Sequence, residues 1–154
     1  MPVLSPRSAS ALVALGGSAA LATAWYFQYV LGYQPCALCL WQRWPYYLGI
    51  PLAAFAALTG RRDVLHLVAL LFAGNALLGL YHAGVEWKFW PGPTSCSGGA
   101  AAVGSGNLLQ DLRHIRIVPC DAAAWRFLGL SFAGWNMVIC AGLAALAAYG
   151  LRKR

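Results

Sequence analysis

The chain has 154 residues, of which 60% are hydrophobic and only 10% are charged, and its mean hydropathy is +0.61. Soluble domains carry about 25% charged residues, and a domain this small leaves much of its surface exposed, so the composition excludes an ordinary water-soluble fold. The net charge of +7 does not indicate nucleic-acid binding, because the 11 Lys and Arg residues are dispersed. Their one dense run, Arg152 to Arg154, follows an apolar segment, as at the end of a membrane helix. We expect a single membrane domain.

Four apolar segments approach or reach the roughly 20 residues that a helix needs to cross a bilayer. They predict an all-α fold, an integral membrane four-helix bundle, with spans at residues 11–31, 40–58, 64–85 and 127–151. The second span contains Pro45 and Pro51, so we expect it to be kinked or short. The first could instead be a cleavable signal peptide, with Arg7 before its apolar stretch. That stretch exceeds the about 7–15 residues of a signal h-region, which favours a retained helix.

The charges of the connecting segments predict an orientation. In a bundle of four spans, Arg7, the pair Arg61 and Arg62, and the basic tail share one face, with only Asp63 as a counter-charge. The positive-inside rule places this face, and both termini, in the cytoplasm. The outer loops, residues 32–39 and 86–126, then lie outside a bacterial inner membrane, in the periplasm.

The long outer loop, residues 86–126, has three parts. Trp87, Phe89 and Trp90 suit the bilayer interface, and residues 91–106 are rich in Pro, Gly and Ser, as in a loop. Within residues 107–118, apolar side chains recur at helical spacing and predict a short amphipathic helix. Such a helix could lie flat on membrane lipid or pack on the ends of the bundle.

Four of the five cysteines fall in the two outer loops: Cys36 and Cys39 in the first, Cys96 and Cys120 in the second. This agrees with the orientation drawn from charge, because disulfides persist on the extracytoplasmic face. The fifth, Cys140, falls inside the last span, where we expect it to be a small buried apolar residue.

Cys36 and Cys39 form a C-x-x-C pair, a spacing that allows an easily exchanged disulfide and often lowers the pKa of one thiol. If the second helix starts near Cys39, its dipole would help to stabilise a thiolate there. Arg43 lies one helical turn further on the same face. It could stabilise a thiolate or the oxygen of a reduced quinone, although its spacing alone favours a simple anchor in the lipid headgroups.

Three interpretations of the outer cysteines compete. Structural zinc usually takes its ligands from two close pairs, whereas residues 97–119 separate Cys96 from Cys120, so we expect no metal. An inert brace is disfavoured because a C-x-x-C loop is too short to remove much chain entropy. The third is a relay, in which one pair meets a soluble thiol partner and the other meets an acceptor in the membrane. No nucleotide or haem motif is evident, so a membrane quinone would supply the oxidant.

Two segments resemble a known family. Residues 35–43, P-C-A-L-C-L-W-Q-R, are similar to the P-C-x-L-C-x-x-x-R signature of the DsbB family of disulfide bond formation proteins. Residues 120–130 resemble the C-x(4)-W-x-F-L-G-L stretch that enters the family's last helix. The spacing of the spans and both outer cysteine pairs match as well, so the resemblance covers most of the chain.

The resemblance implies a quinone-dependent protein dithiol oxidase. A reduced periplasmic DsbA-like thioredoxin-fold oxidase would pass its electrons to Cys96 and Cys120, with Cys96 forming the mixed disulfide. The electrons would then move to Cys36 and Cys39 and on to ubiquinone or menaquinone. In this scheme Cys39 faces the quinone and Arg43 assists.

Other assignments stay open at this point. His82 aligns with a family histidine near the quinone, but it could equally be a polar cap at the helix end, and Glu86 is a weaker candidate. Residues 90–97 and the Gly/Ala run after them depart from the family pattern, which leaves the partner open. Two other functions compete: a membrane scaffold with purely structural disulfides, and a quinone reductase of the vitamin K epoxide reductase type. In the latter the quinone-facing C-x-x-C looks to be on a late helix, whereas here it follows the first span.

Overall fold

The computed structural model describes residues 4–93, 116, 117 and 119–152. Four long helices dominate this part of the chain: α1 (Pro6–Tyr29), α2 (Ala37–Thr59), α3 (Arg62–Glu86) and α5 (Phe132–Gly150). Four two-residue strands lie in the connections: β1 (Tyr33–Gln34), β2 (Arg116–Ile117), β3 (Arg126–Phe127) and β4 (Leu130–Ser131). The protein is therefore mainly helical, as the sequence predicts.

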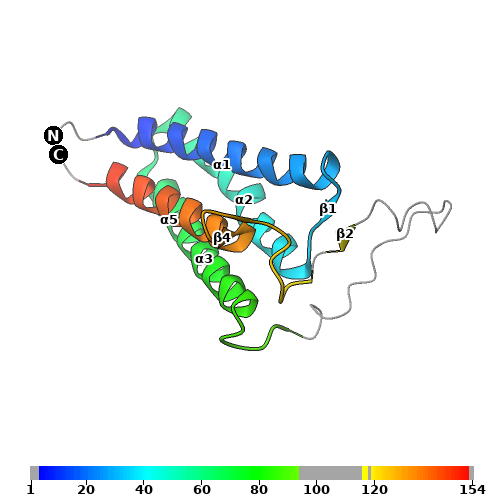
Figure 1. Ribbon diagram of the computed structural model, residues 1–154. Helices are drawn as coiled ribbons and strands as arrows, with labels where there is room; N and C mark the ends of the chain where they lie inside the picture. Colours follow the sequence, from blue (N-terminus) through cyan, green and yellow to red (C-terminus); the bar gives the residue numbers. More distant parts are fainter. Residues whose placement is uncertain (1–3, 94–115, 118, 153–154) are drawn as a thin grey trace.

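The four helices pack side by side, α1 against α2 and α5, and α3 against the same two helices (Figure 1). Their shared core includes Val13, Tyr46, Leu65, Val68 and Phe72, each buried. Three of the helices, α1, α3 and α5, are long and apolar enough to cross a membrane. Helix α2 falls outside this group because its first half carries polar and aromatic side chains, but it is not short: it runs for 23 residues and includes both prolines.

The last helix starts later than the sequence analysis places it. Residues 126–131, which we assign largely to the fourth span, form the antiparallel hairpin β3–β4, and α5 begins only at Phe132. Leu128 and Gly129 both have positive φ, 52° and 82°, as the two-residue turns that suit a hairpin require. Ser131 then caps α5 by accepting a hydrogen bond from the backbone N–H of Gly134 at 3.2 Å. The turn and the cap together exclude a helix over these residues.

The short amphipathic helix expected within residues 107–118 lies mostly outside the described residues. Arg116–Ile117, which the structure does describe, form strand β2 rather than part of a helix.

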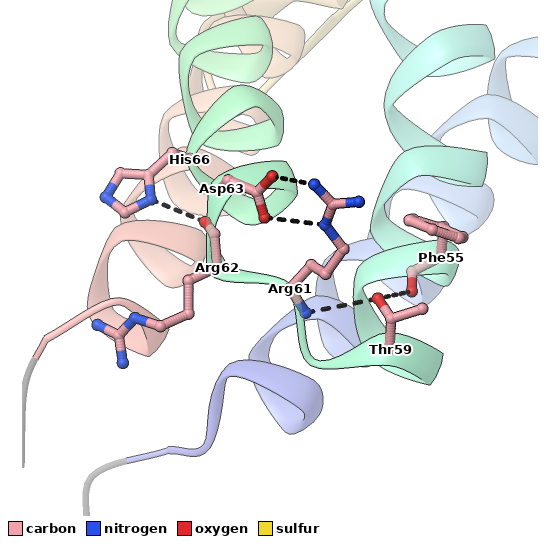
Figure 2. A network of polar contacts seen from close by, with 6 residues as sticks. All are labelled: Phe55, Thr59, Arg61, Arg62, Asp63 and His66. Atoms are coloured by element: carbon pink, nitrogen blue, oxygen red, sulfur yellow. Dashed lines mark hydrogen bonds and ion pairs between the residues drawn. The ribbon is translucent and has the colours of Figure 1, made fainter.

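One end of the molecule carries the basic residues. The α2–α3 connection lies there together with the start of α1 and the end of α5 (Figure 1): the side chain of Arg7 approaches Gly60, and Arg62 donates to the carbonyl of Leu151. Figure 2 shows Arg61 and Asp63 facing each other at this connection, with 2.5 Å between Nη2 and Oδ2. Both side chains are exposed, so the pair contributes little to stability.

Close approach of α3 to α5 at Gly79 leads to a prediction about stability. A Cβ at Gly79 would meet backbone atoms of α5, namely Met137 N at 3.0 Å and Ala133 O at 3.2 Å. Backbone atoms cannot move aside without separating the helices, so we expect Gly79→Ala to lower the free energy of unfolding by about 1–3 kcal/mol. Thermal unfolding in detergent would measure this as a lower Tm.

The matched control is Gly74→Ala in the same helix, where a Cβ would meet nothing within 4 Å. Alanine favours a helix over glycine by about 1 kcal/mol, so this variant should unfold at the same temperature as the parent or slightly higher. Equal Tm losses for the two variants would contradict the close helix crossing.

Candidate functional site

A short parallel strand pairing joins the two outer loops. Tyr33 pairs with Arg116, and Gln34 pairs with Ile117. Because the strands run in the same direction, the residues that follow them leave the pairing side by side. Cys36 lies two residues after β1 and Cys120 lies three residues after β2. This local topology places one cysteine of each sequence pair next to the other.

Cys36 is the N-cap of α2. Its backbone is extended, and its Sγ accepts a hydrogen bond from the backbone N–H of Cys39 at 3.2 Å. A helix N-terminus favours negative charge through its unpaired N–H groups and its dipole. The sequence analysis expects this effect at Cys39. Since the helix starts at Ala37, the sulfur that receives it is that of Cys36.

The Cys36 thiol has a low pKa. Its Sγ lies 2.8 Å from the Sγ of Cys39, a hydrogen-bonding distance longer than the about 2.05 Å of a disulfide. The Nε2 of His82 approaches it from α3 at 3.6 Å. The hydrogen bond with Cys39 and then His82 lower the pKa of Cys36 to about 5, against the opposing effect of burial. Cys36 is therefore a thiolate at neutral pH.

Cys120 completes a cluster of sulfur and imidazole groups. It is disulfide-bonded and fully buried, and it packs with Cys36 and Leu38. The Sγ atoms of Cys36 and Cys120 and a ring nitrogen of His82 all lie within 4.8 Å of one another. This spacing would suit a soft metal ion, but a sulfur held in a disulfide offers no thiolate ligand. The same spacing allows thiol–disulfide exchange. Cys96 lies outside the described residues.

Beside this cluster is a cavity of about 390 Å³, within the usual size range of small-molecule sites. It lies between α1, α2, α5 and the β3–β4 segment. Phe27, Trp125 and Phe132 form one aromatic wall, with ring centroids 4.8–5.6 Å apart. The lining is mostly apolar, so the cavity suits a flat, largely apolar ligand.

A few polar groups converge on this cavity. Its lining includes Cys39, Arg43 and His82, which come from α2 and α3, whereas Cys36 does not reach it. The guanidinium of Arg43 donates to the side-chain oxygen of Gln28 on α1. The structure therefore brings together three of the residues that the sequence analysis singles out, at one wall of one cavity. Cys36 and Cys39 divide the work by position, since one faces Cys120 and the other faces the cavity.

A chain of hydrogen bonds extends from His82 into the helix core. The amide of Gln42 lies 2.7 Å from His82 Nδ1 and, on its other side, 2.7 Å from Asn136 Nδ2. Asn136 accepts from the hydroxyl of Tyr46 at 2.8 Å, and that hydroxyl is 3.1 Å from the Sγ of Cys140. Cys140 is fully buried, as expected, but it is hydrogen-bonded and so is more than an apolar filler.

The sequence analysis misses Gln42 and Asn136. Gln42 stands between the C-x-x-C and Arg43, inside a helix that is otherwise largely apolar, and buried polar residues of membrane helices are often functional. That signal is present for Asn136 too, yet nothing in the sequence joins the two residues, which are 94 positions apart. Glu86, the weaker candidate, is half-buried at the end of α3, where it interacts with Ser131.

The chain was compared with known proteins. The family model for the disulfide bond formation protein DsbB matches residues 6–150. This chain belongs to the DsbB family. Disulfide bond formation protein B of Polaromonas naphthalenivorans is 35% identical over 153 residues, which cover 92% of this chain and 90% of that protein. The protein of the same name from Albidiferax ferrireducens is 33% identical over 142 residues, 88% of this chain and 81% of that protein. No solved structure matches.

Membership of the DsbB family makes the chain an oxidoreductase of disulfide bond formation. It agrees with the three helices that are long and apolar enough to cross a membrane.

Proposed function

We propose that the chain is a quinone-dependent protein dithiol oxidase of the bacterial inner membrane. It would reoxidise a periplasmic DsbA-like thioredoxin-fold protein through Cys96 and Cys120, pass the electrons to Cys36 and Cys39, and deliver them to ubiquinone or menaquinone. The observation that carries this proposal is the cluster of Cys36, His82 and Cys120, with ligand atoms within 4.8 Å. Thiol–disulfide exchange needs a thiolate beside a disulfide sulfur, and this cluster supplies both.

The route would run as follows. Cys96, the proposed disulfide partner of Cys120, is attacked by the soluble protein's thiolate, which frees Cys120. The Cys120 thiolate attacks Cys36 in the Cys36–Cys39 disulfide, and Cys39 leaves as a thiolate. Each step forms one S–S bond and breaks another, so two electrons move inward with no other reactant. The exposed pair Lys88 and Asp121, 2.6 Å apart, ties the segment after Cys120 to the end of α3.

The cavity supports a quinone site. The Arg43 guanidinium and the His82 ring offer N–H groups of the kind that bind carbonyl oxygens, and the aromatic wall suits a flat ring. Arg43 would hold one carbonyl side of the head group, and Cys39 would present its sulfur to the ring. A bound quinone supplies the two-electron acceptor. The chain's own contribution is to hold the sulfur of Cys39 at the cavity wall and to keep water away from it.

We also propose that all four helices cross the membrane, with the cysteine-bearing end in the periplasm and both termini in the cytoplasm. Support comes from the distribution of charge: Arg7, Arg61 and Arg62 gather at the end of the molecule opposite to β1 and β2 (Figure 1). This is the distribution that the positive-inside rule requires. Arg43 and the polar side chains of α2 face the cavity, where membrane helices tolerate them.

The observations do not favour the two alternatives. A scaffold with bracing disulfides has no need of the free thiols of Cys36 and Cys39, 2.8 Å apart beside a cavity. In the vitamin K epoxide reductase type the quinone-facing pair looks to be on a late helix, whereas Cys36 caps α2.

The test is a turnover assay with purified protein in detergent. The donor is a reduced periplasmic thioredoxin-fold oxidase, and the acceptor is a water-soluble ubiquinone analogue followed by its absorbance. The proposal predicts catalytic loss of one quinone for each dithiol oxidised. Oxidation of the donor without loss of quinone, or no turnover at all, would leave the scaffold as the better account.

A further inference from the structure

Gln42 holds a buried position between His82 and Asn136, with only 5% of its surface exposed. Its Nε2 faces the Nδ1 of His82, and its Oε1 accepts from the Nδ2 of Asn136, each at 2.7 Å. An amide nitrogen only donates hydrogen bonds and an amide oxygen only accepts them. Gln42 therefore donates to Nδ1 of His82, and that ring nitrogen carries no proton.

The next residue of the chain fixes this direction. The amide of Asn136 could face Gln42 with either its oxygen or its nitrogen. Its oxygen accepts from the Tyr46 hydroxyl at 2.8 Å, which leaves its nitrogen to donate to Gln42. Every group between Tyr46 and His82 thus has a donor facing an acceptor, and no inverted arrangement satisfies the same contacts.

The ring of His82 is then set in one tautomer. With Nδ1 acting as an acceptor, the ring proton is on Nε2, which lies 3.6 Å from the Sγ of Cys36. His82 is itself only 2% exposed, so water does not compete for this ring. A hydrogen bond to a charged sulfur is stronger than one to a neutral thiol, so the Nε2–H favours negative charge on Cys36.

We propose that Gln42 is a positioning residue, which holds His82 in the Nε2-protonated tautomer so that His82 stabilises the sulfur of Cys36 as a leaving thiolate. The proposal rests on the relay described above. It concerns the step that separates the two cysteine pairs after they have been joined through Cys36 and Cys120.

In that step the thiolate of Cys96 attacks the Sγ of Cys120. A Cys96–Cys120 bond forms, the Cys36–Cys120 bond breaks, and Cys36 leaves as a thiolate. No oxidant or reductant is consumed, and the two electrons remain on Cys36 and Cys39. A thiol that is a better thiolate leaves faster, so the donor that Gln42 orients favours loading of the inner pair. The structure has this distribution, with Cys120 disulfide-bonded and Cys36 and Cys39 free.

Other titratable groups also face Cys36. They are Cys39 in the first turn of α2, Cys120 after β2, and Glu86 at the end of α3, with Arg126 of β3 acting on Glu86. A variant at Gln42 changes none of these groups. Its effect on Cys36 can therefore be assigned to the orientation of His82.

The test compares full-length Gln42→Met with the parent protein, reduced and purified in detergent. Methionine has a similar length but no hydrogen-bonding amide. The rate of alkylation of Cys36 by iodoacetamide is measured against pH, with peptide mass spectrometry to assign the site. We expect the variant's profile to move to higher pH, with Cys36 reacting roughly tenfold more slowly at pH 6 than in the parent, because one hydrogen bond to a charged group is lost.

Two further variants keep the test decisive. Asn136→Ala leaves Gln42 in place but removes the contact that orients it, so we expect a smaller shift in the same direction, and this variant decides the matter if Gln42→Met does not fold. Ser10→Ala removes another buried hydrogen bond, from Ser10 Oγ to Pro6 O at 2.7 Å, and should leave the Cys36 profile unchanged.

The outcomes separate the two proposals, because alkylation needs neither quinone nor partner. Identical profiles for Gln42→Met and the parent, in a parent that turns over quinone, would overturn the role of Gln42 and leave the relay standing. A shifted profile in a parent that consumes no quinone would remove the relay and retain the link from Gln42 to Cys36.

Discussion

Replacement of Cys39 by serine should lower quinone-linked turnover by roughly a thousandfold or more, the usual scale for loss of a covalent nucleophile. Cys39 contributes its sulfur to the cavity wall, whereas Cys36 does not line the cavity. A serine hydroxyl is not ionised at neutral pH and cannot form the Cys36–Cys39 disulfide. The variant should therefore still accept electrons from the donor at Cys120 but should fail to deliver them. Quinone absorbance in the turnover assay measures the loss.

Gly74→Ala serves as the control for this experiment, because nothing lies within 4 Å of the added Cβ and the site is distant from the cavity in α3. It should retain the turnover of the parent protein. Substantial quinone consumption by Cys39→Ser would show that electrons reach the quinone by another route, and the proposed division of roles between Cys36 and Cys39 would be wrong.

Arg43→Ala should raise the apparent KM for quinone by roughly ten- to a hundredfold, with a smaller effect on the turnover number. A hydrogen bond from a charged group contributes about 1.5–3 kcal/mol, and Arg43 is the cationic side chain among the residues of the cavity wall. Steady-state kinetics over a range of quinone concentrations separate the two parameters. Arg43→Lys keeps the charge but loses the planar fork, so it should fall between the parent and Arg43→Ala.

The same variants test the simpler interpretation of Arg43 as an anchor in the lipid headgroups. Its contact with Gln28 joins α2 to α1 and so contributes to stability as well as to binding. Tm should therefore be measured for both variants. An unchanged KM together with a lower Tm would assign Arg43 to helix packing and remove it from the quinone site.

The helices could be predicted from sequence because their apolar runs are long compared with anything a loop contains. The start of α5 could not be predicted, because Phe127, Leu128 and Leu130 are as apolar as the helix that follows them. Their hairpin depends on positive φ at two adjacent residues, one of which is leucine, a residue that rarely adopts it. Hydropathy carries no information about that choice.

The site could be predicted in part. The spacing of Cys36, Cys39 and Arg43 along one helix is local, so the sequence reveals that they lie together. The contact of Cys36 with Cys120 depends on β1 pairing with β2, two-residue strands that have no recognisable pattern. The link from Gln42 to Asn136 depends on how α2 and α5 pack against each other. Non-local register of this kind is set by tertiary packing, so a single sequence does not show it.

The most direct test of the account concerns the contact between Cys36 and Cys120. In a Cys39→Ser, Cys96→Ser double variant, these two residues are the remaining cysteines of the outer loops, and their sulfur atoms lie within 4.8 Å. Mild oxidation of the purified monomer followed by peptide mapping should reveal one intramolecular Cys36–Cys120 disulfide. Two free thiols after oxidation, or disulfides only between separate molecules, would contradict the transfer of electrons between the two pairs.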